Sequence, residues 1–273
     1  MTHPNVNGRM SKQRFTAGIH NYCDRWCERC AFTDRCRVYS DLAKADRRHK
    51  RSGEDPHDPA VALRDVHRSF QRTMRLIARG VKRMGIDLDE IARQAAEAPF
   101  PDRSRIDEHP LVREGMSFFE IGREFVKAVG EQIGLAGEDI ARRSAFMDVK
   151  GEAEELARVA DAVEVLNWDS SLVAVKVHRA VSGLLGDDDD EAAGDDGAAG
   201  DYGAAGDDEA QPDPFHLQDA TATAALVLSC LDRDKRALLA IYDWSRDHQD
   251  AAVELLAKAE RIGRAIRQVL PGK

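Results

Sequence analysis

The sequence predicts an all-α protein, built as an antiparallel bundle of four to six helices. Several long segments place apolar residues three and four positions apart, which is the spacing of a helix with one buried face. No segment alternates apolar and polar residues convincingly, as a half-buried strand would. Four of the five cysteines lie within residues 23–36, which predicts a separate metal-binding loop near the N-terminus.

The clearest helix covers residues 59–84. Asp58 suits the N-cap, Pro59 suits the first turn, and Gly85 suits the end of this helix. Its apolar residues form one line along the helix, called here the apolar stripe: Leu63, Val66, Phe70, Met74, Ile77, Val81 and Met84. We expect the apolar stripe to face the core of the bundle.

The other helices follow from the same spacing. They are expected at residues 87–97, 109–133, 152–185, 217–245 and 249–269. The last two are expected to form a helical pair, so the segment before them reads as an insertion within one bundle.

That inserted segment, residues 186–214, is strongly acidic. It carries 12 Asp and Glu residues and no Lys or Arg, and it repeats AAGDDG, AAGDYG and AAGDDE. We expect it to be disordered, because Ala, Gly and Asp offer little to bury. The net charge of −9 arises in this segment, since the rest of the chain holds 40 basic and 37 acidic residues.

The expected organisation therefore has four parts. Residues 1–55 form a cysteine-rich metal-binding segment, and residues 56–185 form the first part of the bundle. Residues 186–214 are the acidic loop, and residues 215–273 are the helical pair that completes the bundle.

The cysteine spacing is Cys23-x3-Cys27-x2-Cys30-x5-Cys36. Thiolates bind metal, and four of them this close repel one another unless a cation lies between them. Zinc sites usually use two knuckles a dozen or more residues apart, whereas these cysteines follow one another in a single loop. A [4Fe–4S] cluster is wider than one ion and can be wrapped by such a loop. The spacing favours the cluster, with zinc as the alternative and a reactive or metal-free thiol cluster as the third interpretation.

The stretch CERCAFTDRCRVY resembles the cluster loop of endonuclease III-type DNA glycosylases, and similar loops occur in RecB-like exonuclease domains. The resemblance implies that Cys23, Cys27, Cys30 and Cys36 hold a [4Fe–4S] cluster. It is confined to this loop, and the first gap is shorter than in the glycosylases. Neither a helix–hairpin–helix with a glycosylase Lys/Asp pair nor a strand-borne nuclease motif accompanies it. Whether the chain is an enzyme is therefore left open.

A line of cations lies opposite the apolar stripe on the 59–84 helix. This basic stripe consists of Arg64, Arg68, Arg72, Arg75, Arg79 and Lys82. Such a line can follow the phosphates of a nucleic acid, and the alternative is an ordinary solvated face. Aromatic residues for base stacking are not interleaved with it.

Other common sites have no counterpart in the sequence. Walker, Rossmann, HExxH and GxSxG motifs are missing, and no apolar run approaches 18 residues. We expect a cytoplasmic protein without a membrane partner, in which clustered thiols serve as metal ligands. The expected function is to bind a [4Fe–4S] cluster in a structural or redox role. The alternatives are a nucleic-acid-associated protein with a structural cluster, and a zinc-stabilised interaction module.

Overall fold

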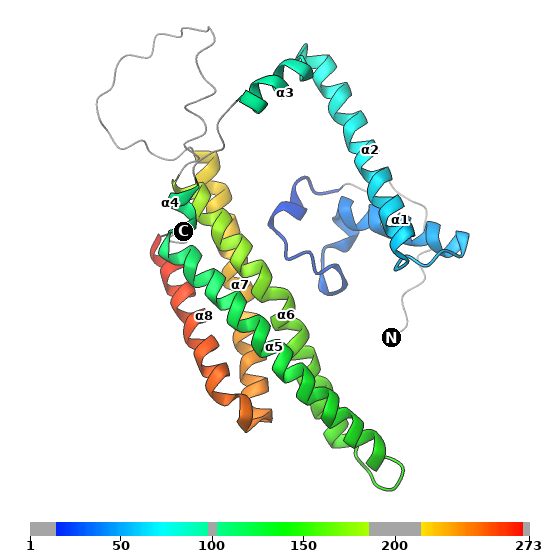
Figure 1. The fold of residues 1–273 in the computed structure, drawn as a ribbon, viewed down its shortest axis with the longest axis vertical. Coiled ribbons are helices and arrows are strands. Elements are labelled where there is room, and N and C mark those ends of the chain that lie inside the picture. The colour runs from blue at the N-terminus through cyan, green and yellow to red at the C-terminus, as the bar shows by residue number, and fades with distance from the viewer. Residues whose placement is uncertain (1–14, 98–102, 186–213, 270–273) are drawn as a thin grey trace. The chain divides into compact units, whose positions relative to one another are not determined.

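The computed structural model describes residues 15–97, 103–185 and 214–269, and in these ranges it contains helices and turns without a strand (Figure 1). The all-α class is therefore confirmed. The chain divides into two units, Met1–Phe100 and Pro101–Lys273, and each is described here by itself. The first boundary expected from the sequence lies between residues 55 and 56 instead. The acidic segment, for which disorder was expected, lies outside the described residues except for Pro214.

The described part of the N-terminal unit, from residue 15, begins with a cysteine loop that contains three short 3-10 helices. They are η1 (Ile19–Tyr22), η2 (Cys27–Arg29) and η3 (Thr33–Arg35). Three α-helices follow: α1 (Arg37–Ser52), α2 (Pro59–Met84) and α3 (Leu88–Glu97). The helix α2 has the bounds expected from the sequence.

The ends of α2 are set by local chemistry. The Asp58 carboxylate accepts a hydrogen bond from the Ala60 N–H at 2.8 Å, and Pro59 occupies the first turn. Gly85 adopts a φ of 70°, and its N–H donates to the Val81 carbonyl group. A left-handed residue after the last turn is favourable for glycine and ends the helix there.

The apolar stripe of α2 is not buried, and in this respect the expectation is wrong. Leu63 is 70% exposed and Phe70 is 68% exposed, and most of the other stripe residues are exposed as well. The buried residue of α2 is Val61, which is not part of the stripe. The spacing of apolar residues identifies the apolar face of a helix, but it does not identify what covers that face.

The C-terminal unit contains four long helices. Its elements are α4 (Ser104–Asp107), α5 (Pro110–Arg143), α6 (Lys150–Leu185), α7 (Pro214–Trp244), η5 (Arg246–His248) and α8 (Gln249–Val269). The helix α6 packs against both α5 and α7, and α8 packs against the same two helices (Figure 1). The long helices thus enclose a common core.

Side chains from all four long helices fill this core. The largest fully buried ones include Phe118, Leu166, Val173, Val177, Leu231, Leu238, Ile241, Leu255 and Ile262. The helices α6 and α7 approach closely at Gly183, where a Cβ atom would lie 3.1 Å from the His216 carbonyl oxygen and 3.2 Å from the Ala220 Cβ. A larger residue at position 183 would push the two helices apart.

Candidate metal centre

The four N-terminal cysteines lie where turns begin and end. Cys23 follows η1, and Cys27 and Cys30 stand at the start of η2 and directly after it. Cys36 follows η3 and is also the N-cap of α1. Each of the three turns is followed by a cysteine with an extended backbone, so the chain bends repeatedly between the cysteines of this loop.

Backbone hydrogen bonds hold this loop together. The Thr16 N–H donates to the Arg35 carbonyl oxygen at 3.0 Å, which joins the start of the loop to its end. Between Cys23 and Cys27 the chain turns at Trp26, whose φ of −83° and ψ of 74° form an inverse γ-turn. The Cys27 N–H donates across that turn to the Arg25 carbonyl oxygen at 3.0 Å. The position of Cys27 is therefore fixed by the backbone.

Trp26 anchors the middle of the loop. It is 6% exposed, and its backbone N–H donates to the Asp24 carboxylate at 3.1 Å. The Arg29 guanidinium lies 4.0 Å from the centre of the Trp26 ring. Arg25, which directly precedes Trp26, has a φ of 58°, which is uncommon for a residue other than glycine. The loop thus combines a buried aromatic side chain with cations held close to the cysteines.

The pKa of the Cys27 thiol reflects its neighbours. Burial, the Glu28 carboxylate and the thiols of Cys36, Cys23 and Cys30 all raise the pKa of Cys27. The other three thiols therefore lie near enough to Cys27 to disfavour its thiolate form. A metal cation between them would reverse this effect, because it attracts every thiolate around it.

Two of the sulfur atoms also accept backbone hydrogen bonds. The Phe32 N–H donates to the Cys30 Sγ at 3.4 Å, and the Tyr39 N–H donates to the Cys36 Sγ at 3.5 Å. Bonds of this kind are among the contacts that adjust the potential of a thiolate-bound cluster.

The thiols are neighbours, but they do not converge on one point. In the parts of the chain that the structure describes, no group of three or more His, Cys, Asp or Glu side chains is arranged to hold a single metal ion. The donor set itself consists of four thiols on one loop, and two of the sulfur atoms accept hydrogen bonds from backbone N–H groups. Its chemistry suits a thiophilic metal or cluster.

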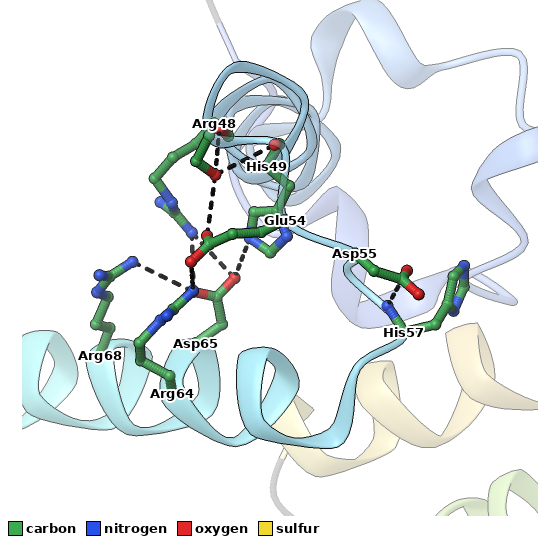
Figure 2. Close-up of polar contacts among 9 residues, drawn as sticks. Arg48, His49, Glu54, Asp55, His57, Arg64, Asp65 and Arg68 are labelled. Atoms are coloured by element: carbon green, nitrogen blue, oxygen red, sulfur yellow. Dashed lines mark hydrogen bonds and ion pairs between the residues drawn. The ribbon is translucent and has the colours of Figure 1, made fainter.

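A polar junction joins α1 to α2 (Figure 2). The Asp65 carboxylate on α2 lies 2.6 Å from the buried His49 Nε2 and 3.0 Å from the Arg48 guanidinium, both on α1. Burial by itself would raise the pKa of Asp65, but the hydrogen bond with His49 and the nearby charges lower it overall. In the linker between the helices, Glu54 pairs with Arg64. The junction fixes the first turns of α2 beside α1.

The basic stripe extends along α2 as expected, but its two ends differ. At the N-terminal end, Arg64 pairs with Glu54, and Arg68 lies 3.4 Å from Asp65 (Figure 2). Further along, Arg72, Arg75 and Lys82 are exposed, and no ion pair is found for them among the described residues. The ion pairs at the first end reduce the charge available to a phosphate backbone there.

A buried charged cluster in the C-terminal unit was not predicted from the sequence. The Arg233 guanidinium donates to both oxygens of the buried Asp169 carboxylate, at 2.7 and 2.8 Å. Beside them, Asp234 is 0% exposed, and neither of its carboxylate oxygens has a hydrogen-bond partner among the described residues. An Asp-Arg-Asp sequence on a helix resembles an ordinary solvated turn, so only the packing reveals that these groups are buried.

No helix in the described ranges is both long and apolar enough to cross a membrane. No protein-family model matches the chain, and no curated protein or solved structure shows significant similarity to it.

Proposed function

We propose that the cysteine loop binds a [4Fe–4S] cluster through Cys23, Cys27, Cys30 and Cys36. The observation that carries this proposal is the placement of four free cysteines at the ends of successive turns in one loop, with the other three thiols near enough to Cys27 to raise its pKa. Four thiolates on a continuous loop suit the width of a cubane. The backbone N–H groups directed at Cys30 and Cys36 supply the hydrogen bonds that such sulfurs accept.

A cluster held in this way supplies either a structural link or a site for one-electron transfer. All four positions around it would be occupied by cysteine, so no iron would be left without a protein ligand. Activation of a substrate usually needs an open position at the metal. The donor set therefore favours a structural or redox role over catalysis at the iron.

The test is purification without oxygen, followed by an absorption spectrum and metal analysis. We expect a brown protein with broad absorption near roughly 400 nm and about four iron and four sulfide per chain. Cys27→Ser should remove the colour and the iron, because Cys27 is one of the four proposed ligands and all three other thiols act on it.

Cys230 provides the matched control. It is buried in the C-terminal unit, where its sulfur lies 3.4 Å from the Arg233 guanidinium. Because Cys230 does not belong to the cysteine loop, Cys230→Ser should leave the iron content unchanged. A colourless protein with one zinc and no sulfide would establish the zinc alternative instead. A protein with neither metal, prepared with adequate iron, would refute the metal site.

A further inference from the structure

The apolar stripe of α2 is an exposed surface that extends along the whole helix. Leu63, Val66, Phe70, Met74, Ile77 and Met84 are all exposed, each by 44% or more. If each presents on the order of 100 Å² of apolar area, the stripe amounts to roughly 600 Å². Contiguous apolar patches above a few hundred Å² on a soluble protein mark an interaction site.

The shape of the stripe indicates the kind of partner. At 3.6 residues per turn, its seven residues occupy only about 80° of the helix circumference. A narrow seam with spacings of three and four is typical of a helix that packs against another helix. A helix that lies in a membrane surface generally presents a broader apolar face. The partner surface is therefore expected to be a second helix.

The borders of the stripe carry no charge. Ser69, Thr73 and Gly80 lie along one border, and a Cβ atom at Gly80 would meet nothing within 4 Å. From the helical repeat, the nearest charged residues begin about 80° or more beyond either border. A partner helix can thus approach closely without burying a charge.

The stripe is also nearly symmetric about its own centre. Three pairs of its residues are equidistant from a point between positions 73 and 74. These pairs are Leu63 with Met84, Val66 with Val81, and Phe70 with Ile77. An antiparallel copy of α2 placed on a two-fold axis at that point would set an apolar residue opposite an apolar residue at every pair. We propose that the occupant of the stripe is α2 of a second copy of this chain, in antiparallel orientation.

The charges agree with this arrangement. The basic stripe lies on the opposite side of α2, so the basic stripes of two copies would face outward, with both helices between them. Antiparallel pairing also sets the two α1 junctions, built on Arg48, His49 and Asp65, at opposite ends of the pair. A parallel pair would bring these junctions, and like ends of the helix dipoles, together. The roughly 600 Å² from each copy approaches the about 800 Å² per partner of a standard interface.

The first test is the mass of the full-length protein, purified without oxygen, by sedimentation over a range of micromolar concentrations. We expect a dimer. Phe70→Glu should raise its dissociation constant at least about thirtyfold, since a central apolar anchor is replaced by a charge. Leu76→Glu is the matched control, because Leu76 is 55% exposed on the same helix but lies outside the stripe. It should remain a dimer, and circular dichroism should show equal helix content in both variants.

The second test addresses the orientation. Val66→Glu and Val81→Lys should each weaken the dimer, and the double variant should restore it, because antiparallel pairing sets these two positions opposite each other across the interface. If both single variants dimerise weakly and the double variant dimerises no better, the antiparallel orientation is overturned. A wild-type chain that stays monomeric would overturn the proposal. If that monomer bound vesicles of phosphatidylcholine and phosphatidylserine through Phe70, a membrane surface would be the occupant instead.

Discussion

At the scale of single residues, Asp234 is a carboxyl group buried without a hydrogen-bond partner among the described residues. Burial, and then the Asp169 carboxylate, raise its pKa well above the ordinary value of 3.8, and Arg233 only partly opposes them. The folded state therefore keeps the Asp234 proton at pH values where the unfolded chain has lost it. The contribution of that proton to the free energy of unfolding is fully present below about pH 3.8. It is lost as the pH rises through the folded-state pKa.

We therefore expect Asp234→Asn, which cannot ionise, to stabilise the protein at neutral pH by up to about 2 kcal/mol. The gain should shrink as the pH is lowered and vanish below about pH 3.8, where the unfolded chain also takes up the Asp234 proton. Urea unfolding at several pH values measures it. Asp232→Asn, an exposed position on the same helix, should not reproduce the pH dependence. A gain that is equal at every pH would contradict the assignment.

Residues of the two sites differed in how far the sequence predicted them. The cysteine loop was predictable because the spacing of four thiols is a local property of the chain. The cluster of Asp169, Arg233 and Asp234 was not predictable, because it joins two helices that are far apart in the sequence. Arg233 lies 64 positions after Asp169 and reaches it from another helix. The same applies to the His49–Asp65 contact, which depends on how α1 lies beside α2.

At the scale of elements, the core of the C-terminal unit depends on the helix faces that pack together. Phe118 on α5 is 1% exposed and is among the largest fully buried side chains. Phe118→Ala should therefore lower the free energy of unfolding by about 3–5 kcal/mol. Phe146→Ala is the comparison, because Phe146 is 92% exposed, and it should change stability by less than about 0.5 kcal/mol. Chemical denaturation measures both, and a loss below about 1 kcal/mol for Phe118→Ala would mean that the core is assigned to the wrong face of α5.

The bounds of the helices show what local sequence can predict. Those of α2 followed from Asp58, Pro59 and Gly85, which act within one turn. The end of α5 was expected near residue 133, but the helix continues to Arg143. The added turns contain Gly134 and Gly137, which weaken a helix on their own. They are held in place by α6: a Cβ atom at Gly137 would lie 3.7 Å from the Leu156 side chain, and Arg143 pairs with Glu152.

At the scale of the whole molecule, the division into two units predicts that the metal loop and the C-terminal core respond separately. If the loop holds the proposed cluster, removing the iron should increase hydrogen exchange in residues 15–52, since metal binding would order the loop. Exchange in α5 to α8 should remain the same. Mass spectrometry of the loaded and depleted protein measures both regions at once. Faster exchange in α6 or α7 after depletion would show that the two units are coupled.

The double position of Cys36 has a consequence for how the N-terminal unit folds. Nucleation is the unfavourable step in helix formation, because several residues must be ordered before the first hydrogen bonds form. Cys36 ends the cysteine loop, and its sulfur accepts the Tyr39 N–H in the first turn of α1. Fixing this sulfur in a metal site would order the residue from which α1 starts. Formation of the site would then nucleate α1, and α1 would in turn bring His49 and Arg48 to Asp65 on α2.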